Sequence, residues 1–195
     1  MYKFFFKAFF DSILSLIAII LISPILLIAA LLIKLDSKGP IFFLQERLGK
    51  DQKIFKVIKF RTMTHIERKV IVQTFKDSPE ITGVGKYLRR FKIDELPQLF
   101  NVFLGDMAVI GPRPCLLQTM EKFGNADTPY RFKVKPGLSS NAGVNGSIFL
   151  TWDEKWWYDK DYVENVSFFL DIQIIVKTIL VVIFGEEKFI KKPKI

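Results

Sequence analysis

The longest uncharged stretch of the chain, residues 12–33, limits its fold and its location more than any other feature. Its 22 residues would form a helix of roughly 33 Å at about 1.5 Å per residue, long enough to cross the hydrocarbon core of a bilayer. A cleaved signal peptide fits less well, because the stretch is longer than a typical apolar signal core and no small-x-small cleavage site precedes a polar start. The sequence therefore predicts an N-terminal membrane segment.

Ser23 and Pro24 interrupt this stretch at its midpoint. Proline removes a backbone donor and its ring clashes with the carbonyl four residues earlier, so a kink or break is expected, with the Ser23 hydroxyl placed to satisfy a freed carbonyl. Each half, of about 11 residues, is too short to cross hydrocarbon alone. Lysines flank both ends, which is compatible with two cytoplasmic ends. We interpret residues 1–38 as a re-entrant membrane hairpin; one kinked spanning helix is the alternative, since membrane helices tolerate proline.

Charge and composition limit the classes of molecule that the chain is expected to bind. The 29 Lys and Arg outnumber the 20 Asp and Glu, giving a net charge of +9, which favours nucleic acid, phosphorylated metabolites or acidic lipids. Half of the residues are apolar and the mean hydropathy is +0.24, whereas a soluble nucleic-acid binder is usually more polar. The chain has one cysteine, Cys115, and one histidine, so it cannot form an internal disulfide or a His/Cys zinc cluster. The lone histidine also argues against the nucleophilic triads that need a histidine beside serine or cysteine. A free thiol suits the cytoplasm.

The remaining residues, 39–195, read as one cytoplasmic domain of α+β class that is mainly helical. Residues 41–44 and 54–60 flank a polar turn and predict a β-hairpin. The largely apolar residues 168–184 predict either a core helix or an interfacial helix partly sunk in lipid. The basic tail over residues 188–194 is compatible with anionic headgroups or with simple disorder.

Thr151 and Glu154 have the spacing of a capping box and predict the start of a helix. Aromatic residues are dense in the segment that follows, and such a band suits a bilayer interface. Its members are Trp152, Trp156, Trp157, Tyr158 and Tyr162.

Asp94 and Glu95 are the candidate catalytic residues. They precede an apolar run that predicts a helix. Pro97 lies in the expected first turn of this helix and Gly105 lies just past its end, where proline and glycine are usually found. Carboxylates at a helix start are expected to stay ionised, and the same position welcomes phosphate. Two carboxylates can also hold Mg²⁺ together with phosphate oxygens. The plain alternative is a pair of acidic residues that favour a helix N-terminus.

Arg113 lies between Pro112 and Pro114, which limit the freedom of its backbone. A guanidinium held in this way is a good phosphate clamp. An ordinary proline turn is the alternative.

In their order along the chain, these motifs resemble the bacterial sugar transferase family, the small monotopic phosphoglycosyl transferases. The resemblance runs nearly end to end. Besides Ser23-Pro24, it rests on Gln45-x-Arg47-x-Gly49, Lys59-Phe60-Arg61-Thr62-Met63, the run from Asp94-Glu95-Leu96-Pro97 to Asn101-Val102, Gly105-Asp106-Met107, and Gly111-Pro112-Arg113-Pro114.

The resemblance implies a two-step reaction at the cytoplasmic face of the bacterial inner membrane. Asp94 would attack the sugar-proximal phosphate of a UDP-sugar and release UMP, after which polyprenol phosphate would take the phosphosugar. Glu95 would help to hold Mg²⁺, with Asp94, or manage protons. Lys59 and Arg113 would bind nucleotide or sugar phosphate, and Arg89 would meet the polyprenol phosphate.

Three more residues enter the implied substrate site. Asp171 matches an acidic family position, while Lys135 and Asn145 lie in a loop that departs from the family pattern. Residues 135–140 and 142–147 read Lys-Pro-Gly-Leu-Ser-Ser and Ala-Gly-Val-Asn-Gly-Ser, and lack two arginines and a glutamine of the family. In place of an arginine, Lys135 keeps the positive charge but cannot form two parallel hydrogen bonds to a phosphate, and Ser147 carries no charge. A changed sugar specificity is our hypothesis, and weakened activity is its rival.

Two other function classes compete with the transferase. A membrane-anchored non-enzymatic scaffold, or an inactive homologue, would need neither adjacent carboxylates nor a fixed arginine. A tethered nucleic-acid binder should carry a basic patch with stacking aromatics on a recognisable module. We therefore expect UDP-sugar, polyprenol phosphate and the membrane as partners and no nucleic acid; the sequence leaves open whether the chain forms a homodimer.

Overall fold

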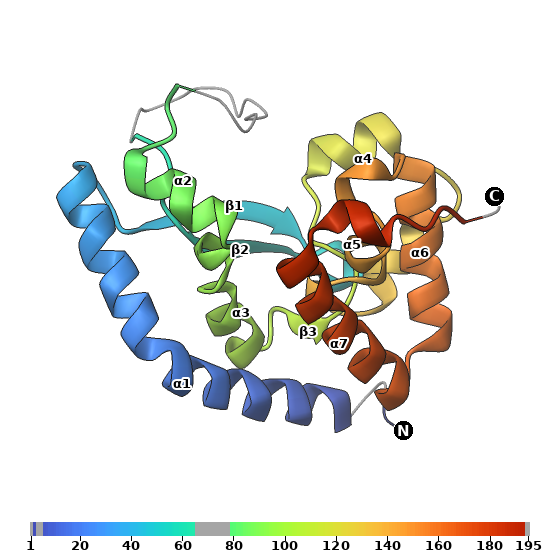
Figure 1. Ribbon diagram of the computed structural model, residues 1–195. Coiled ribbons are helices and arrows are strands. Elements are labelled where there is room, and N and C mark those ends of the chain that lie inside the picture. Colours follow the sequence, from blue (N-terminus) through green and yellow to red (C-terminus); the bar gives the residue numbers. More distant parts are fainter. Residues whose placement is uncertain (1, 3–5, 65–78, 194–195) are drawn as a thin grey trace.

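The computed structural model describes residue 2 and residues 6–64 and 79–193. Its first element is α1 (Lys7–Asp36), a single helix that contains Pro24 and bends partway along its length (Figure 1). The Ser23 hydroxyl donates to the carbonyl oxygen of Ile20 at 2.8 Å, which is the carbonyl that Pro24 cannot bond because it has no N–H. The predicted kink is confirmed, and the helix stays continuous through it.

α1 exposes apolar side chains along most of its length. Leu21, Leu27 and Leu35 are each more than 70% exposed, and only 11% of the most apolar window of α1 is buried. Within the described part of the chain, α1 alone is long and apolar enough to cross a membrane. Because water disfavours so much contiguous apolar surface, this surface favours attachment to a membrane.

The C-terminal end of α1 is anchored to the rest of the protein. Ala29 and Ile33 pack with Phe60 and Leu88 in one buried cluster. The buried guanidinium of Arg61 donates to the carbonyl oxygens of Ile33, Ser37 and Lys38. A cation at the last carbonyls of a helix satisfies acceptors that lack partners within the helix.

The predicted β-hairpin is confirmed as β1 (Phe42–Leu48) and β2 (Ile54–Phe60), antiparallel strands joined through η2 (Lys50–Gln52). Next come α2 (Gly83–Arg90), η3 (Ile93–Glu95) and α3 (Gln98–Leu104). Asn101 is almost fully buried and fastens α3 to β2: it accepts a hydrogen bond from Ile58 N at 2.9 Å and donates one to Lys56 O at 2.8 Å.

A second, very small sheet follows. Strand β3 (Ala108–Ile110) pairs in parallel with β4 (Gly137–Ser139). At the end of this pair, a Cβ on Gly137 would lie 2.1 Å from the backbone nitrogen of Gly111. Only glycine allows so close an approach of two backbones, and this approach places the loop after β3.

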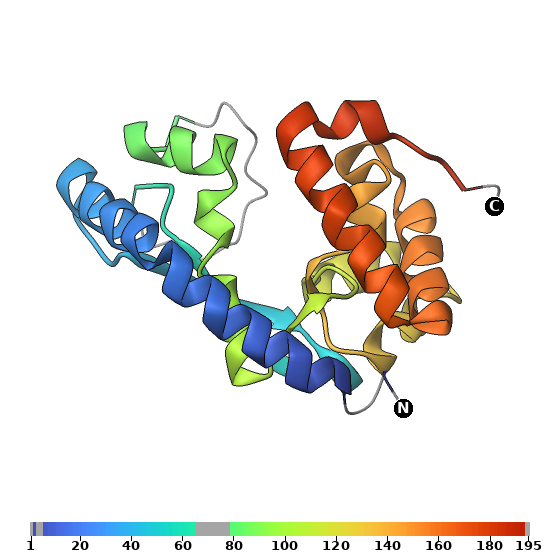
Figure 2. The same cartoon turned by 60° about the horizontal axis from the view of Figure 1, so that its bottom comes forward.

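The C-terminal half is helical, and Figure 2 shows it as a group of helices beside β3. It comprises α4 (Leu117–Phe123), η4 (Thr128–Lys133), α5 (Asn141–Val144), η5 (Ser147–Phe149), α6 (Trp152–Asn165), α7 (Phe168–Phe184) and η6 (Glu186–Phe189).

α6 starts with the predicted capping box: Thr151 N donates to Glu154, and Glu154 N donates to Thr151. The interfacial position predicted for its aromatic band is wrong for Trp156, Tyr158 and Tyr162, which are at most 5% exposed. Each buries its ring in the core and uses its polar atom inside the protein, as when Trp156 Nε1 donates to Phe123 O at 2.6 Å.

α7 has the bounds that the sequence predicts, and its apolar residues divide between two faces. Ile174 and Val181 are buried in the main core with Tyr162. Phe169 and Ile183 are 84% and 65% exposed, and several other apolar residues share their exposure. α7 is therefore a core helix on one side and presents an unburied apolar surface on the other.

Candidate functional site

Asp94 and Glu95 lie in η3, a single 3-10 turn between α2 and α3. Lys92 adopts the left-handed conformation, with φ at 55°, and turns the chain out of α2. α3 begins at Gln98, so the prediction that the carboxylates occupy the start of this helix is wrong by about one turn. The hydrogen bond from Leu96 N to Ile93 O follows the tighter 3-10 pattern instead.

Glu95 lies between two cations. Its Oε1 accepts from Lys59 Nζ at 2.7 Å and from an Arg113 terminal nitrogen at 2.5 Å. Burial opposes ionisation of Glu95, but Arg113 and Lys59 together hold its pKa well below its usual range. Glu95 is therefore ionised at neutral pH and ties β2 to the loop containing Arg113.

Asp94 has the opposite titration behaviour. Burial, followed by the negative charge of Glu95, raises its pKa to about 6, while Lys59 and Arg89 oppose the rise. The helix-terminus argument does not account for this rise, because the short turn gives less support than burial takes away. At neutral pH the carboxylate is still mainly ionised, and its charge is poorly compensated.

Arg113 is held in place through its backbone. The Arg131 guanidinium donates to the carbonyl oxygen of Arg113, and Arg47 donates to that of Pro114 at 3.3 Å. The side chain of Arg113 is nevertheless 59% exposed. The loop therefore presents a guanidinium that is fixed at its base and open to an anion at its tip.

Arg89 borders the same site from α2. Its Nε donates to Thr62 Oγ1 at 2.9 Å, and its charge lowers the pKa of Asp94. Four of the predicted residues besides Asp94 thus meet in one place: Glu95, Lys59, Arg89 and Arg113.

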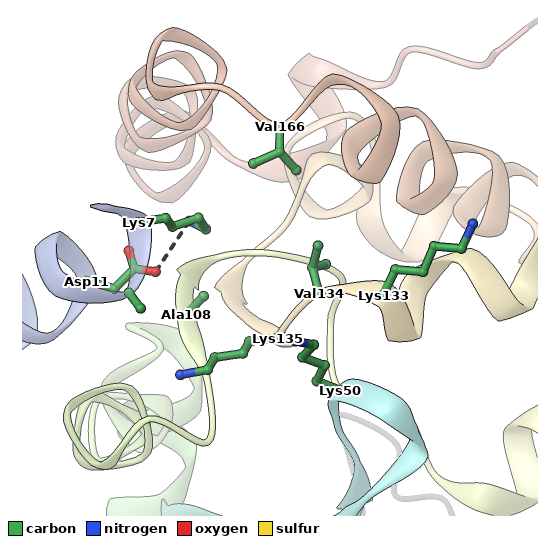
Figure 3. Close-up of a pocket in the computed structure, with 9 residues that line it drawn as sticks. Lys7, Asp11, Lys50, Ala108, Lys133, Val134, Lys135 and Val166 are labelled. Atoms are coloured by element: carbon green, nitrogen blue, oxygen red, sulfur yellow. Dashed lines mark ion pairs between the residues drawn. The ribbon is translucent and has the colours of Figure 1, made fainter. Parts of the chain in front are cut away.

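Lys135 lies elsewhere. It lines a pocket with Lys50, beside the ion pair of Lys7 and Asp11 (Figure 3). Its Nζ would lie 3.3 Å from a Cβ on Gly105, the residue that ends α3. Lys135 is therefore at the far end of α3 from η3.

Asp171 and Asn145 have partners inside the protein. The buried Asp171 carboxylate accepts from Lys7 at 2.7 Å and from Tyr162 at 2.6 Å. Asn145 donates to Asn141 and accepts from Lys177 at 2.6 Å. The structure does not bring either residue into the cluster around Asp94.

The adjacent carboxylates fit a magnesium ion shared with a substrate. Among the residues that the structure describes, no group of three or more His, Cys, Asp and Glu forms a metal site. Both cations bind Oε1 of Glu95, and within the described residues no hydrogen bond reaches its Oε2. One or two carboxylates completed by phosphate oxygens are the ligand set that Mg²⁺ prefers.

Sequence reasoning assigned no role to Arg131, Lys92 or Glu186. Arg131 holds the Arg113 backbone, and Glu186 forms an ion pair with Lys92 beside η3. A basic or acidic residue in a loop gives no local signal of such a contact, because its partner is far away in the sequence.

The chain resembles known proteins along most of its length. The sequence model of a family described as bacterial sugar transferase matches residues 2–185. A UDP-glucose:undecaprenyl-phosphate glucose-1-phosphate transferase of Klebsiella pneumoniae is 42% identical over 182 residues, covering 89% of this chain and 39% of that protein. A UDP-N-acetylgalactosamine-undecaprenyl-phosphate N-acetylgalactosaminephosphotransferase of Aeromonas hydrophila is 40% identical, covering 93% of this chain and 44% of that protein.

A shorter relative matches over most of both sequences. The uncharacterized sugar transferase EpsL of Bacillus subtilis is 37% identical over 180 residues, covering 92% of this chain and 88% of that protein. The chain therefore spans about two fifths of the two longer relatives and most of the short one.

Proposed function

The chain belongs to the bacterial sugar transferase family, and we propose that it transfers a sugar 1-phosphate from a UDP-sugar to a polyprenol phosphate, with release of UMP. The observation that carries the proposal is the cluster at η3. There, Asp94 lies next to a Glu95 that is ion-paired with Lys59 and Arg113. Phosphoryl transfer needs a positioned nucleophile and cations around the transferred group, and this cluster supplies both.

In the first step, a carboxylate oxygen of Asp94 attacks the phosphorus next to the sugar. A bond from that oxygen to phosphorus forms as the bond to the UMP oxygen breaks, and UMP leaves with the electron pair. Arg113, Lys59 and Arg89 offset the charge of the phosphates. Asp94 suits the role of nucleophile because nearby cations compensate its charge only in part. Glu95 suits it less well, because Lys59 and Arg113 both bind Glu95 and stabilise its negative charge.

In the second step, an oxygen of polyprenol phosphate attacks the phosphorus of the Asp94-bound phosphosugar. The bond to Asp94 breaks, which restores the carboxylate and yields a polyprenyl diphosphate sugar. Arg89 approaches the site from α2, which packs against the C-terminal end of α1 through Leu88, and so suits the lipid-borne phosphate. Asp94 and Glu95 would hold a magnesium ion, which when bound neutralises charge on the substrate phosphates.

The membrane arrangement proposed for the chain follows from α1. Its bend at Pro24, its exposed apolar surface and the lysines at both of its ends suit a helix that enters the cytoplasmic leaflet and returns to the same side. In this arrangement residues 1–38 form the membrane segment and residues 39–195 form the catalytic domain on the cytoplasmic face of the inner membrane. Tags at Met1 and at the C-terminus should then both be accessible from the cytoplasm; an external N-terminus contradicts the arrangement.

Intact-mass analysis tests the catalytic proposal. Purified protein given a panel of UDP-sugars with Mg²⁺ and no lipid acceptor should gain the mass of one phosphosugar and release UMP. Asp94→Asn should do neither, because its amide cannot act as the nucleophile. A wild-type protein that forms no adduct and releases no UMP with every sugar, with or without acceptor, would instead support an inactive homologue or a scaffold.

A further inference from the structure

The segment that follows α7 brings a third carboxylate to the catalytic cluster. α7 ends at Phe184, and Gly185, with φ at 94°, turns the chain into η6. This positive φ is one that a residue with a side chain rarely adopts. η6 begins with Glu186.

Glu186 contacts the site directly. Its Oε1 forms an ion pair with the ammonium of Lys92, two residues before Asp94. The Glu186 side chain is only 19% exposed, whereas Lys92 is 49% exposed. Glu186 is therefore a largely buried carboxylate held by Lys92, the residue that precedes the turn of Asp94.

A carboxylate in this position is unsuited to binding phosphate, because like charges repel. It is well suited to hydroxyl groups, since an ionised carboxylate only accepts hydrogen bonds and those it accepts are strong. In a nucleotide sugar, the sugar is bonded directly to the phosphate that Arg113 and Asp94 would bind. Lys92 lies two residues before Asp94, so a carboxylate paired with Lys92 is close to that phosphate and to the ring hydroxyls of the sugar.

We propose that Glu186 is a specificity-determining residue that accepts hydrogen bonds from hydroxyl groups of the donor sugar, with Lys92 holding it in place until the sugar arrives. This inference rests on the function proposed above. The family match ends at residue 185, so the carboxylate belongs to a segment through which this chain could differ from its relatives. A site that uses a buried polar group to recognise a hydroxyl discriminates strongly against sugars that present it differently.

Three variants test the proposal in the full-length protein with polyprenol phosphate. kcat/KM for UMP release is measured with UDP-glucose, UDP-galactose and their two N-acetylamino counterparts. Glu186→Gln should lower kcat/KM for the best donor about tenfold or more, mainly through KM, and should change the ratio between epimers. Lys92→Gln should lower all four values by similar factors. Glu187→Gln, which removes the adjacent exposed charge, is the matched control and should change nothing.

Two results overturn the proposal while the proposed function stands. One is an unchanged epimer ratio in Glu186→Gln beside an active wild type. The other is a Glu186→Gln protein in which kcat/KM changes between UDP-glucose and TDP-glucose but not between different sugars, which would mean that Glu186 recognises the nucleoside. If the wild type releases no UMP at all, the proposed function fails instead. Saturation-transfer NMR on Asp94→Asn then still tests Glu186: signals from the sugar protons must weaken in the Glu186→Gln double variant, and unchanged signals contradict the contact.

Discussion

Burial and the charge of Glu95 raise the pKa of Asp94 to about 6. The proposed nucleophile should therefore titrate in a pH range in which the reaction can be measured. Only the carboxylate can attack, so the single-turnover rate of UMP release should rise with pH through about 6 and then level off. Lys59→Gln removes a charge that lowers this pKa and should move the midpoint to higher pH. Glu95→Gln removes a charge that raises it and should move the midpoint to lower pH, whatever either variant does to the maximal rate.

Lys56→Gln is the matched control for this measurement. Lys56 lies on the same strand as Lys59 and is exposed, and the same charge is removed without contact with either carboxylate. Its midpoint should equal that of the wild type. Midpoints that move in the same direction in Lys59→Gln and Glu95→Gln would contradict the electrostatic account of Asp94.

Single residues show how far the site could be predicted from sequence. Asp94, Glu95 and Arg113 could be found because their neighbours form recognisable motifs. Glu186 could not, because it meets Lys92 across 94 positions of the chain, and no local pattern reports such a contact. The raised pKa of Asp94 could not be predicted, because the helix-terminus argument includes the dipole but omits burial, which only the folded structure reveals.

At the scale of elements, the close contact of β3 with β4 positions the loop of Arg113. Gly137→Ala would place a methyl group 2.1 Å from the Gly111 nitrogen, so the two backbones must separate. We expect a loss of about 1 to 3 kcal/mol in the free energy of unfolding and a fall in UMP release, because Gly137 N also donates to Pro112 O, next to Arg113, at 2.9 Å.

Melting temperature in detergent and UMP release measure the two effects of Gly137→Ala. Gly83→Ala is its control: a Cβ there would meet only Asp36 Oδ1, at an ordinary 3.5 Å. A Gly137→Ala protein that melts and reacts like Gly83→Ala would show that the backbone approach is dispensable.

The bend of α1 yields a second prediction at this scale. Pro24→Ala restores an N–H that can bond the Ile20 carbonyl, so the helix should straighten and lose the geometry that returns it to the same leaflet. Ser23→Ala removes only the hydroxyl that now bonds Ile20 and should keep the bend. Accessibility of a tag at Met1 from the cytoplasm should therefore fall in Pro24→Ala alone; equal accessibility in both variants would mean that proline does not set the topology.

Elements also differ in how well the sequence predicts them. The hairpin and α7 were predictable because alternation and an apolar run are local signals. The burial of α6 was not, because aromatic residues mixed with charges suit an interface and a core equally. Arg131 is the difference: it pairs with Asp159 at 3.5 Å and lies over the Trp156 ring, so the charge of Asp159 is satisfied inside the protein. The parallel pairing of β3 and β4 left no sequence signal, since each strand is only three residues long.

At the scale of the whole molecule, α1 and α7 carry the exposed apolar surface together. Lys7 near the start of α1 binds Asp171 in the first turn of α7 at 2.7 Å, so the two helices meet at these ends. An apolar groove lined by Phe10, Leu14 and Ile172, among others, runs between them. If α1 enters the membrane, this junction requires the outer face of α7 to lie against lipid as well.

Site-specific labelling tests this arrangement, because the native Cys115 is buried and an introduced cysteine can be labelled selectively. Spin labels at Leu21 and Phe169, 73% and 84% exposed, should both be accessible to oxygen and protected from a water-soluble nickel chelate in lipid nanodiscs. A label at the exposed Glu164 of α6 should show the reverse. A Phe169 label with the water-like profile of Glu164 would mean that α1 alone contacts lipid.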